Sequence, residues 1–229
     1  MRRRIRVLVV DDHPVVLAGL VMALGQQPDI ELVVSASNRE EASRLLGEQR
    51  IDVGLVDVRL QNGTGFDLIG AHPTEPGPAW IVLSSFESPQ YLAAALRAGA
   101  AGYMVKTTPL GRLLEAVRAV AEGGTAYEAR QLRNAQPALV QSLSNREREV
   151  LRGVVAGRSN DEIGLDLGIR RKTVESYLSG LYERFGVSSR TELAVLAERE
   201  GWLDLPLPRR ERGSTGGAPE GQGGPPKAA

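Results

Sequence analysis

Short apolar runs alternate with helix-period segments from residue 5 to about residue 123. The runs are rich in β-branched residues, and the segments between them repeat their apolar positions at helical spacing, so the pattern indicates successive βαβ units. We therefore predict an α/β fold with a doubly wound sheet of five parallel strands. The predicted strands lie at Val7–Val10, Glu31–Ser35, Val53–Val56, Ile81–Leu83 and Tyr103–Val105, and the predicted helices at Pro14–Gln26, Arg39–Gln49, Phe66–Ala71, Pro89–Ala98 and Pro109–Glu122.

Polar side chains follow four of the five predicted strands: the adjacent Asp11 and Asp12, then Asp57, Ser84 and Lys106. Ligands of such a sheet bind just beyond the carboxyl ends of its strands, so we expect these side chains to meet in one crevice. An Asp at a strand end often only caps the next helix, and a single Lys usually faces water. The coincidence at four strand ends favours a functional site instead.

Three carboxylates, a hydroxyl and an ammonium suit a divalent cation and a phosphoryl group. Asp57 is the candidate nucleophile, because a carboxylate can accept a phosphoryl group when cations neutralise the transferring oxygens. Asp12, with Asp11 acting through water, would hold Mg²⁺, which favours one or two carboxylates plus waters. Lys106 would supply the fixed cation and Ser84 a hydroxyl donor.

The second half of the chain has no strand-like runs from Leu143 to Leu203. Three Ser-x-x-Glu sequences, which are typical of the capping boxes that start helices, open apolar-periodic segments there. A further helix fits between the last two boxes, so we predict an all-α domain of four helices. The boxes are Ser144/Glu147, Ser159/Glu162 and Ser189/Glu192.

The segment between Ser159 and Phe185 predicts a helix, a tight turn at Gly168 and a second helix. The second helix would bury the stripe of Val174, Leu178, Leu181 and Phe185. Its outer face is small and polar with a basic N-terminal turn, which suits the major groove of double-stranded DNA, although an ordinary solvated helix face has the same pattern. The candidate DNA-binding residues are Arg170, Arg171, Lys172, Thr173, Glu175, Ser176 and Ser179.

Composition narrows the function further. The 28 basic and 28 acidic residues cancel, so a polyanion must be bound by a local patch. There is no cysteine and there are only two histidines, which excludes disulfides and thiolate chemistry and leaves little scope for zinc. The apolar run after the first arginines is too short for a signal peptide or a membrane span, so we predict a cytoplasmic protein without a membrane partner.

These patterns divide the chain into four parts. Residues 1–123 form the α/β domain, residues 124–142, mixed in Gly, Gln and Asn, form a linker, and residues 143–203 form the helix-turn-helix domain. From Pro206 onward the chain is Pro, Gly and Arg/Glu with almost no apolar content, so we predict that residues 204–229 form a disordered tail.

Four segments of the first half carry a more specific signal: Val9-Val10-Asp11-Asp12-His13-Pro14, Leu55-Val56-Asp57-Val58-Arg59, Leu83-Ser84-Ser85 and Gly102-Tyr103-Met104-Val105-Lys106. They resemble the receiver domain of two-component response regulators. The resemblance implies that Asp57 is the phosphoacceptor, that Asp11 and Asp12 are the acidic pair, and that the backbone carbonyl of Arg59 is a further metal ligand.

The same resemblance implies that Ser84 and Tyr103 form a hydroxyl and aromatic switch pair, with Lys106 on the phosphate. Ser85 is the alternative to Ser84, and Tyr103 fits core packing equally well. The sequence departs from the family pattern at Leu60-Gln61, where Met-Pro is usual.

In the second half, Leu143–Leu151, Gly157–Ile163 and Lys172–Tyr177 resemble the LuxR-type helix-turn-helix of NarL/FixJ response regulators. Tyr177 stands where a histidine is common. Arg170 stands where a capping Ser is common, which removes a cap but adds a phosphate-binding charge.

The two resemblances together imply a DNA-binding transcriptional response regulator. A partner sensor histidine kinase would phosphorylate Asp57 with Mg²⁺, and phosphorylation would favour a homodimer and operator binding, with the Ser189–Glu200 helix either forming the dimer contact or only packing internally. RNA polymerase is a further candidate partner. Two alternatives stay open: the same architecture controlled by a ligand or protein without phosphorylation, and a metal-dependent phosphotransfer enzyme of the haloacid dehalogenase type.

Overall fold

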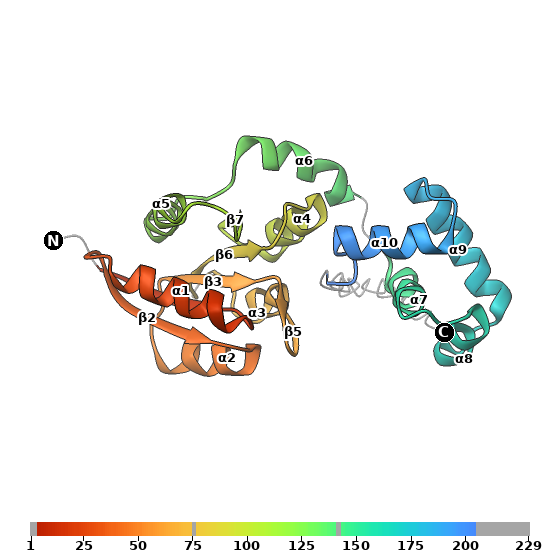
Figure 1. Cartoon of the computed structure of the whole chain (residues 1–229), viewed down its shortest axis with the longest axis horizontal. Helices are drawn as coiled ribbons and strands as arrows, with labels where there is room; N and C mark the ends of the chain where they lie inside the picture. The colour runs from red at the N-terminus through yellow and green to blue at the C-terminus, as the bar shows by residue number, and fades with distance from the viewer. Residues whose placement is uncertain (1–3, 75–76, 141–142, 205–229) are drawn as a thin grey trace, which may run out of the picture.

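The fold is seen in a computed structural model that describes residues 4–74, 77–140 and 143–204, without the side chains of residues 136–140 (Figure 1). A sheet with flanking helices makes up the first half, and helices alone make up the second. The predicted domain boundaries stay predictions, and residues 205–229 of the predicted tail lie outside the described residues. Among the described residues, no helix is long and apolar enough to cross a membrane.

Five parallel strands form one sheet in the order β2-β1-β3-β6-β7, which confirms the predicted doubly wound sheet. The direction of winding reverses between β1 and β3, and ligands of this architecture bind at the carboxyl ends of the strands beside such a switch. The strands are β1 (Ile5–Val10), β2 (Ile30–Ala36), β3 (Val53–Asp57), β6 (Ala79–Ser84) and β7 (Gly102–Val105).

Helices cover both faces of the sheet, so its strands are buried on each side (Figure 1). Val7 and Val9 pack with the helices of one face, whereas Leu8 and Val10 pack with those of the other. The first face carries α1 (Pro14–Gly25) and α5 (Leu110–Ala121), and the second carries α2 (Arg39–Glu48), α3 (Gly65–Ala71) and α4 (Pro89–Ala98).

A short antiparallel hairpin, not predicted from the sequence, joins β3 to α3. It pairs β4 (Arg59–Leu60) with β5 (Gly63–Thr64). Thr64 then starts α3 through a capping box with Asp67. A Cβ added at Gly65 would lie 2.2 Å from the carbonyl oxygen of Asp57, so only glycine lets α3 begin this close to the end of β3.

The four helices predicted between Leu143 and Leu203 are confirmed, and α6 precedes them in the predicted linker and packs against α4. The five helices are α6 (Ala129–Val140), α7 (Asn145–Val155), α8 (Asn160–Leu167), α9 (Arg171–Phe185) and α10 (Arg190–Glu200). Gly168 ends α8 in the left-handed conformation at φ +64°, as the tight turn requires.

Two of the three predicted capping boxes form completely, those of Ser144 and Ser159. Ser189 caps α10 by accepting from the Glu192 backbone N–H, but the Glu192 carboxylate accepts from Ser188 N–H at 2.7 Å instead of from Ser189. The start of α10 was therefore predicted correctly, but the Glu192 carboxylate accepts from the backbone N–H one residue earlier than a capping box requires.

The end of α10 lies against the receiver-like half of the chain (Figure 1). Arg59 Nε donates to Asp204 Oδ2 at 2.9 Å, and the Tyr91 hydroxyl on α4 donates to the same carboxylate oxygen. Ser88 Oγ, which caps α4, donates to the Glu200 carbonyl oxygen at 3.1 Å. We call these five residues the α4–α10 junction.

Candidate metal centre and nucleic-acid interface

Asp11, Asp12, Asp57 and Lys106 lie together at the carboxyl ends of β1, β3 and β7, and we call this group the acidic crevice. Lys106 Nζ lies 2.7 Å from Asp11 Oδ2 and 3.0 Å from Asp57 Oδ2, so one ammonium bridges the carboxylates that follow two different strands. Asp11 and Asp57 are buried, and Asp12 is partly exposed. The crevice therefore holds three carboxylates around a single ammonium group.

The electrostatics of the crevice reflect this imbalance. Burial raises the pKa of Asp57 to about 6; Lys106 opposes the rise, and the Asp11 carboxylate adds to it. Burial lowers the pKa of Lys106, but its contacts with Asp11 and Asp57 outweigh burial and leave that pKa above its ordinary value. Lys106 is thus a permanent cation, while Asp57 has a reduced tendency to carry its charge.

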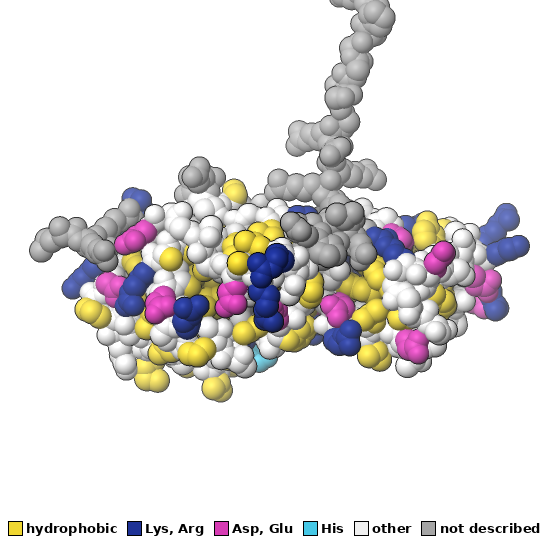
Figure 2. All heavy atoms as spheres, turned by 90° about the horizontal axis from the view of Figure 1, so that it is seen from above, with side chains coloured by type: hydrophobic (Ala, Val, Ile, Leu, Met, Phe, Trp, Pro, Cys, Tyr) yellow, Lys and Arg dark blue, Asp and Glu magenta, His cyan; other side chains and the backbone are white. Residues whose placement is uncertain are grey.

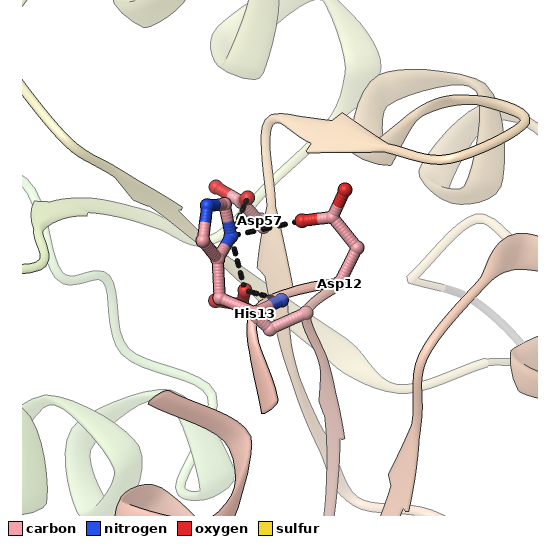
Figure 3. A group of neighbouring side chains, drawn as sticks. Asp12, His13 and Asp57 are labelled. Atoms are coloured by element: carbon pink, nitrogen blue, oxygen red, sulfur yellow. Dashed lines mark hydrogen bonds and ion pairs between the residues drawn. The ribbon is translucent and has the colours of Figure 1, made fainter. Parts of the chain in front are cut away.

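The donor set fits a hard divalent cation. Oxygen atoms of Asp11, Asp12 and Asp57 lie within 4.8 Å of one another, together with a ring nitrogen of His13. Asp12 Oδ1 is shielded from solvent and has no hydrogen-bond partner among the described residues, as expected of an atom that would face a cation. Figure 3 shows Asp12, His13 and Asp57 converging on one point.

Sequence reasoning missed His13. Its Nδ1 lies 2.9 Å from Asp12 Oδ1, 3.1 Å from Asp11 Oδ1 and 3.9 Å from Asp57 Oδ2. Its position directly after Asp11 and Asp12 could have indicated that it lies near them, but the prediction considered only the polar residues at the strand ends. The Arg59 side chain points to the α4–α10 junction, and its backbone carbonyl stays a predicted ligand.

Ser84 and Tyr103 share one acceptor. Ser84 Oγ and the Tyr103 hydroxyl each donate to the Phe86 carbonyl oxygen at 2.9 Å, and both side chains are buried. Ser85, the alternative to Ser84, is exposed. Tyr103 is already inward in this structure, so a switch that uses it would start from a buried ring. The Phe86 ring stacks on Tyr91, which links this pair to the α4–α10 junction.

The outer face of α9 is exposed as predicted from its pattern. Val174, Leu178 and Leu181 are buried, and Phe185 is half-buried with its ring 3.9 Å from that of Trp202. The seven candidate DNA-binding residues are exposed, except that Glu175 is half-buried: Arg170, Arg171, Lys172, Thr173, Glu175, Ser176 and Ser179.

Ion pairs already occupy part of this face. Arg171 contacts Glu175 at 2.8 Å and Asp161 at 3.1 Å, so its charge is partly neutralised, whereas no such pair is found for Lys172 among the described residues. On the molecular face drawn in Figure 2, basic and acidic side chains are interspersed. Contact with a polyanion therefore depends on local geometry at α9 and not on a field of one sign.

The fold and the crevice define a two-component receiver joined to a helix-turn-helix output domain. The family model of the response regulator receiver domain matches residues 7–118, and that of bacterial regulatory proteins of the luxR family matches residues 141–197. The chain is 36% identical to the transcriptional regulatory protein LiaR of Bacillus subtilis over 207 residues, covering 85% of this chain and 97% of LiaR. It is 33% identical to the DNA-binding transcriptional activator DevR/DosR of Mycobacterium tuberculosis over 203 residues, covering 84% and 94%.

Two solved structures are similar over most of their length. The response regulator ChrA of a heme-sensing two-component system aligns with a TM-score of 0.52 at 32% identity, covering 87% of this chain and 98% of ChrA. RcsB from Salmonella enterica serovar Typhimurium, bound to a promoter in the presence of phosphomimetic BeF₃⁻, aligns with a TM-score of 0.62 at 26% identity, covering 84% and 97%.

The chain belongs to the NarL-type response regulators, which combine a receiver domain with a LuxR-type DNA-binding domain. Members of this family regulate transcription and are not enzymes. The alternative of a metal-dependent phosphotransfer enzyme is therefore set aside.

Proposed function

We propose that Asp57 accepts a phosphoryl group from a sensor histidine kinase in a Mg²⁺-dependent reaction, and that phosphorylation favours a homodimer bound to its DNA operator. The observation that carries the proposal is the Lys106 ammonium held between Asp11 and Asp57 at the carboxyl end of the sheet. A fixed cation at this place is needed whenever a carboxylate attacks a phosphoryl group, because both are negatively charged.

The protein's own groups divide the work of transfer. An Asp57 carboxylate oxygen attacks the phosphorus, the phosphorus–nitrogen bond of the kinase phosphohistidine breaks, and the product is an acyl phosphate. Lys106 pairs with a phosphate oxygen, and Ser84 turns from the Phe86 carbonyl to donate to another. Asp12, Asp57 and the carbonyl of Arg59, with Asp11 acting through water, would hold Mg²⁺, which neutralises charge on the transferring oxygens.

At the output end, Arg170, Arg171 and Lys172 would contact phosphates, while Thr173, Glu175, Ser176 and Ser179 would face base edges in the major groove. A homodimer is supported by the RcsB dimers seen on DNA, because one helix-turn-helix reads only a half-site. On α10, Leu193 and Ala197 are buried within the chain, Leu196 is partly buried, and Val195 is 62% exposed, so Val195 is the most accessible of these apolar side chains for a partner. RNA polymerase stays a candidate partner, and a cytoplasmic location stays a prediction.

Intact-mass spectrometry after incubation with a small phosphodonor tests the proposal. We expect one added phosphoryl group with Mg²⁺, none in excess chelator and none in Asp57→Asn. Asp166→Asn, an exposed Asp on α8, is the matched control and should label normally. Labelling of Asp57→Asn would show that the phosphoacceptor is wrong, and absence of labelling in the wild type together with unchanged DNA binding would favour control by a ligand or protein.

A further inference from the structure

Tyr91 on α4 joins the core of the first half of the chain to the end of α10. Its side chain is buried, and its hydroxyl donates to an Asp204 carboxylate oxygen. Burial and this hydrogen bond raise the pKa of Tyr91 above its ordinary value, so the hydroxyl keeps the proton that it donates. A Cβ at Gly201 would overlap the Tyr91 ring, so α10 ends in direct contact with that ring. One side chain therefore packs in the first half and holds the second.

A short route of contacts connects Tyr91 to the acidic crevice. The Phe86 ring stacks on the Tyr91 ring with 5.7 Å between the centroids. The Phe86 carbonyl oxygen accepts from Ser84 Oγ and from the Tyr103 hydroxyl, at 2.9 Å each. Ser84 and Asp57 end the neighbouring strands β6 and β3. The residue that would donate to a phosphate on Asp57 is thus bonded to the residue that stacks on Tyr91.

The Ser84 bond is the contact on this route that a phosphate would change. Tyr103 is already buried and bonded inward, so its ring has no outward position to leave. Ser84 Oγ, in contrast, would turn from the Phe86 carbonyl to a phosphate oxygen. The Phe86 ring is 40% exposed, so it has room to shift when that bond breaks. The aromatic pair that would respond is therefore Phe86 and Tyr91.

Among the described residues, the α4–α10 junction leaves the DNA-reading face of α9 uncovered. Arg170, Lys172, Ser176 and Ser179 are exposed while the junction is formed. The helix α10 lies between α4 and α9 and contacts both, so the junction fixes the position of the output half through α10 (Figure 1). Two output domains on one duplex must lie about one helical turn apart. A fixed output half therefore restricts pairing with a second copy and not contact with DNA itself.

We infer that phosphorylation opens the α4–α10 junction through Ser84, Phe86 and Tyr91. The inference rests on the proposed phosphorylation and names the contact that it changes. The phosphate attracts Ser84 Oγ, the Phe86 carbonyl loses one of its two donors, and the stacked rings shift so that Tyr91 releases Asp204. The output half is then free to pair with a second copy, while the α9 face stays as exposed as before.

Hydrogen exchange of the full chain measures the junction. Three backbone N–H groups among residues 201–204 are hydrogen-bonded at the end of α10 and report its release. With Mg²⁺ and BeF₃⁻, the phosphomimetic used with RcsB, we expect exchange there to be about fivefold faster. Tyr91→Phe removes only the hydroxyl and should give fast exchange without BeF₃⁻. Tyr127→Phe is the matched control, because the Tyr127 hydroxyl donates to the Ala100 carbonyl oxygen at 2.8 Å, away from the junction, and it should behave as wild type.

The variant Phe86→Leu tests the route, because it keeps the backbone carbonyl and removes the ring that stacks on Tyr91. We expect exchange at residues 201–204 to be the same with and without BeF₃⁻ in this variant. A response equal to that of the wild type would mean that the signal reaches Asp204 by another route, such as Arg59, and would overturn the inference.

Binding to a short scrambled duplex, long enough for one output domain, gives the second readout. Tyr91→Phe and wild type should bind it equally, within about twofold, while sedimentation should show dimers of Tyr91→Phe at lower protein concentration. Much tighter binding of Tyr91→Phe to this duplex would show that the junction covers the DNA-reading face, against the inference. Wild-type exchange unchanged by BeF₃⁻, in a chain whose Asp57 a small phosphodonor labels, would overturn the inference and leave the proposed phosphoryl transfer standing. If Asp57 is not labelled, both fall.

Discussion

In the acidic crevice the charged side chains are buried against one another, whereas on the outer face of α9 they are exposed and paired only locally. Asp57 has its pKa raised to about 6 by burial, with Lys106 as the bridging cation. Arg171, by contrast, forms two surface ion pairs that contribute little to stability. The crevice thus holds charges at a cost to folding until a cation and a phosphate arrive, while the α9 face keeps its charges at the surface, where a partner can reach them.

The largest expected effect concerns the cost of the buried Asp57 charge. The pKa of this acid rises from 3.8 to about 6 on folding, so between these values the folded chain holds more protons than the unfolded chain. The free energy of unfolding should therefore fall as pH rises from about 4 to 6, by up to about 3 kcal/mol from this group alone. Asp57→Asn should remove that dependence and be more stable than wild type at pH 7.

Urea unfolding in chelator at several pH values measures this difference. Asp166→Asn should track the wild type across the range, because that exposed carboxylate is not buried in the crevice. Adding Mg²⁺ should recover part of the wild-type loss at pH 7. A stability difference between Asp57→Asn and wild type that is independent of pH would show that the buried charge is not its cause.

The same contrast explains how much could be predicted from the sequence. The crevice was predictable because each of its residues ends a strand or follows one within two residues, and the carboxyl ends of parallel strands meet at one edge. The position of His13 could not be predicted, because the direction of its side chain depends on the hydrogen bond from its backbone N–H to Asp11 Oδ1. The β4–β5 hairpin was missed because two-residue strands carry no periodicity.

Contacts between segments far apart in the chain also could not be predicted from the sequence. Asp204 was assigned to the start of a disordered tail on composition, yet it accepts bonds from Tyr91 and Arg59. Local patterns give no information on such a partner 113 residues away in the chain. On α9, the exposed face was predictable from the buried stripe, but the pairing of Arg171 with Asp161 required the observed packing of α8 on α9.

A smaller effect tests whether the α4–α10 junction holds together the half of the chain that contains the crevice and the half that contains α9. Gly186 and Gly201 both end helices in the left-handed conformation, at φ +63° and +66°. A Cβ at Gly186 meets nothing within 4 Å, whereas one at Gly201 would lie about 2.1 Å from the Tyr91 ring. Gly186→Ala should cost about 1 kcal/mol from backbone strain alone, and Gly201→Ala should in addition separate α10 from α4.

Chemical unfolding and limited proteolysis of both variants distinguish strain from separation. We expect a larger loss of unfolding free energy in Gly201→Ala than in Gly186→Ala, and faster cleavage near the junction only in Gly201→Ala. Identical cleavage patterns in the two variants would mean that the junction seen here does not hold the two halves together in solution.

On the α9 face, Lys172 and Arg171 should differ although both are basic. Lys172→Ala should weaken binding to all duplexes and lower the slope of log affinity against log salt by about one unit. Arg171→Ala should change the slope by less, because Glu175 and Asp161 already neutralise part of its charge. Titrations on cognate and scrambled duplexes at several salt concentrations measure both. Equal slopes for the two variants would show that DNA displaces the ion pairs of Arg171.

The smallest and most specific effects should come from Glu175 and Ser179. Ser179→Ala removes one exposed hydroxyl and should change preference at particular base pairs by about 1 kcal/mol without altering the salt slope. Glu175→Ala should act in two ways, because it removes a base-edge acceptor and also releases Arg171. We therefore expect Glu175→Ala to lose sequence preference while gaining affinity for scrambled DNA. The double variant Arg171→Ala/Glu175→Ala should show no such gain. If the double variant gained as much affinity for scrambled DNA as Glu175→Ala does, the Arg171–Glu175 pair would not restrain DNA binding.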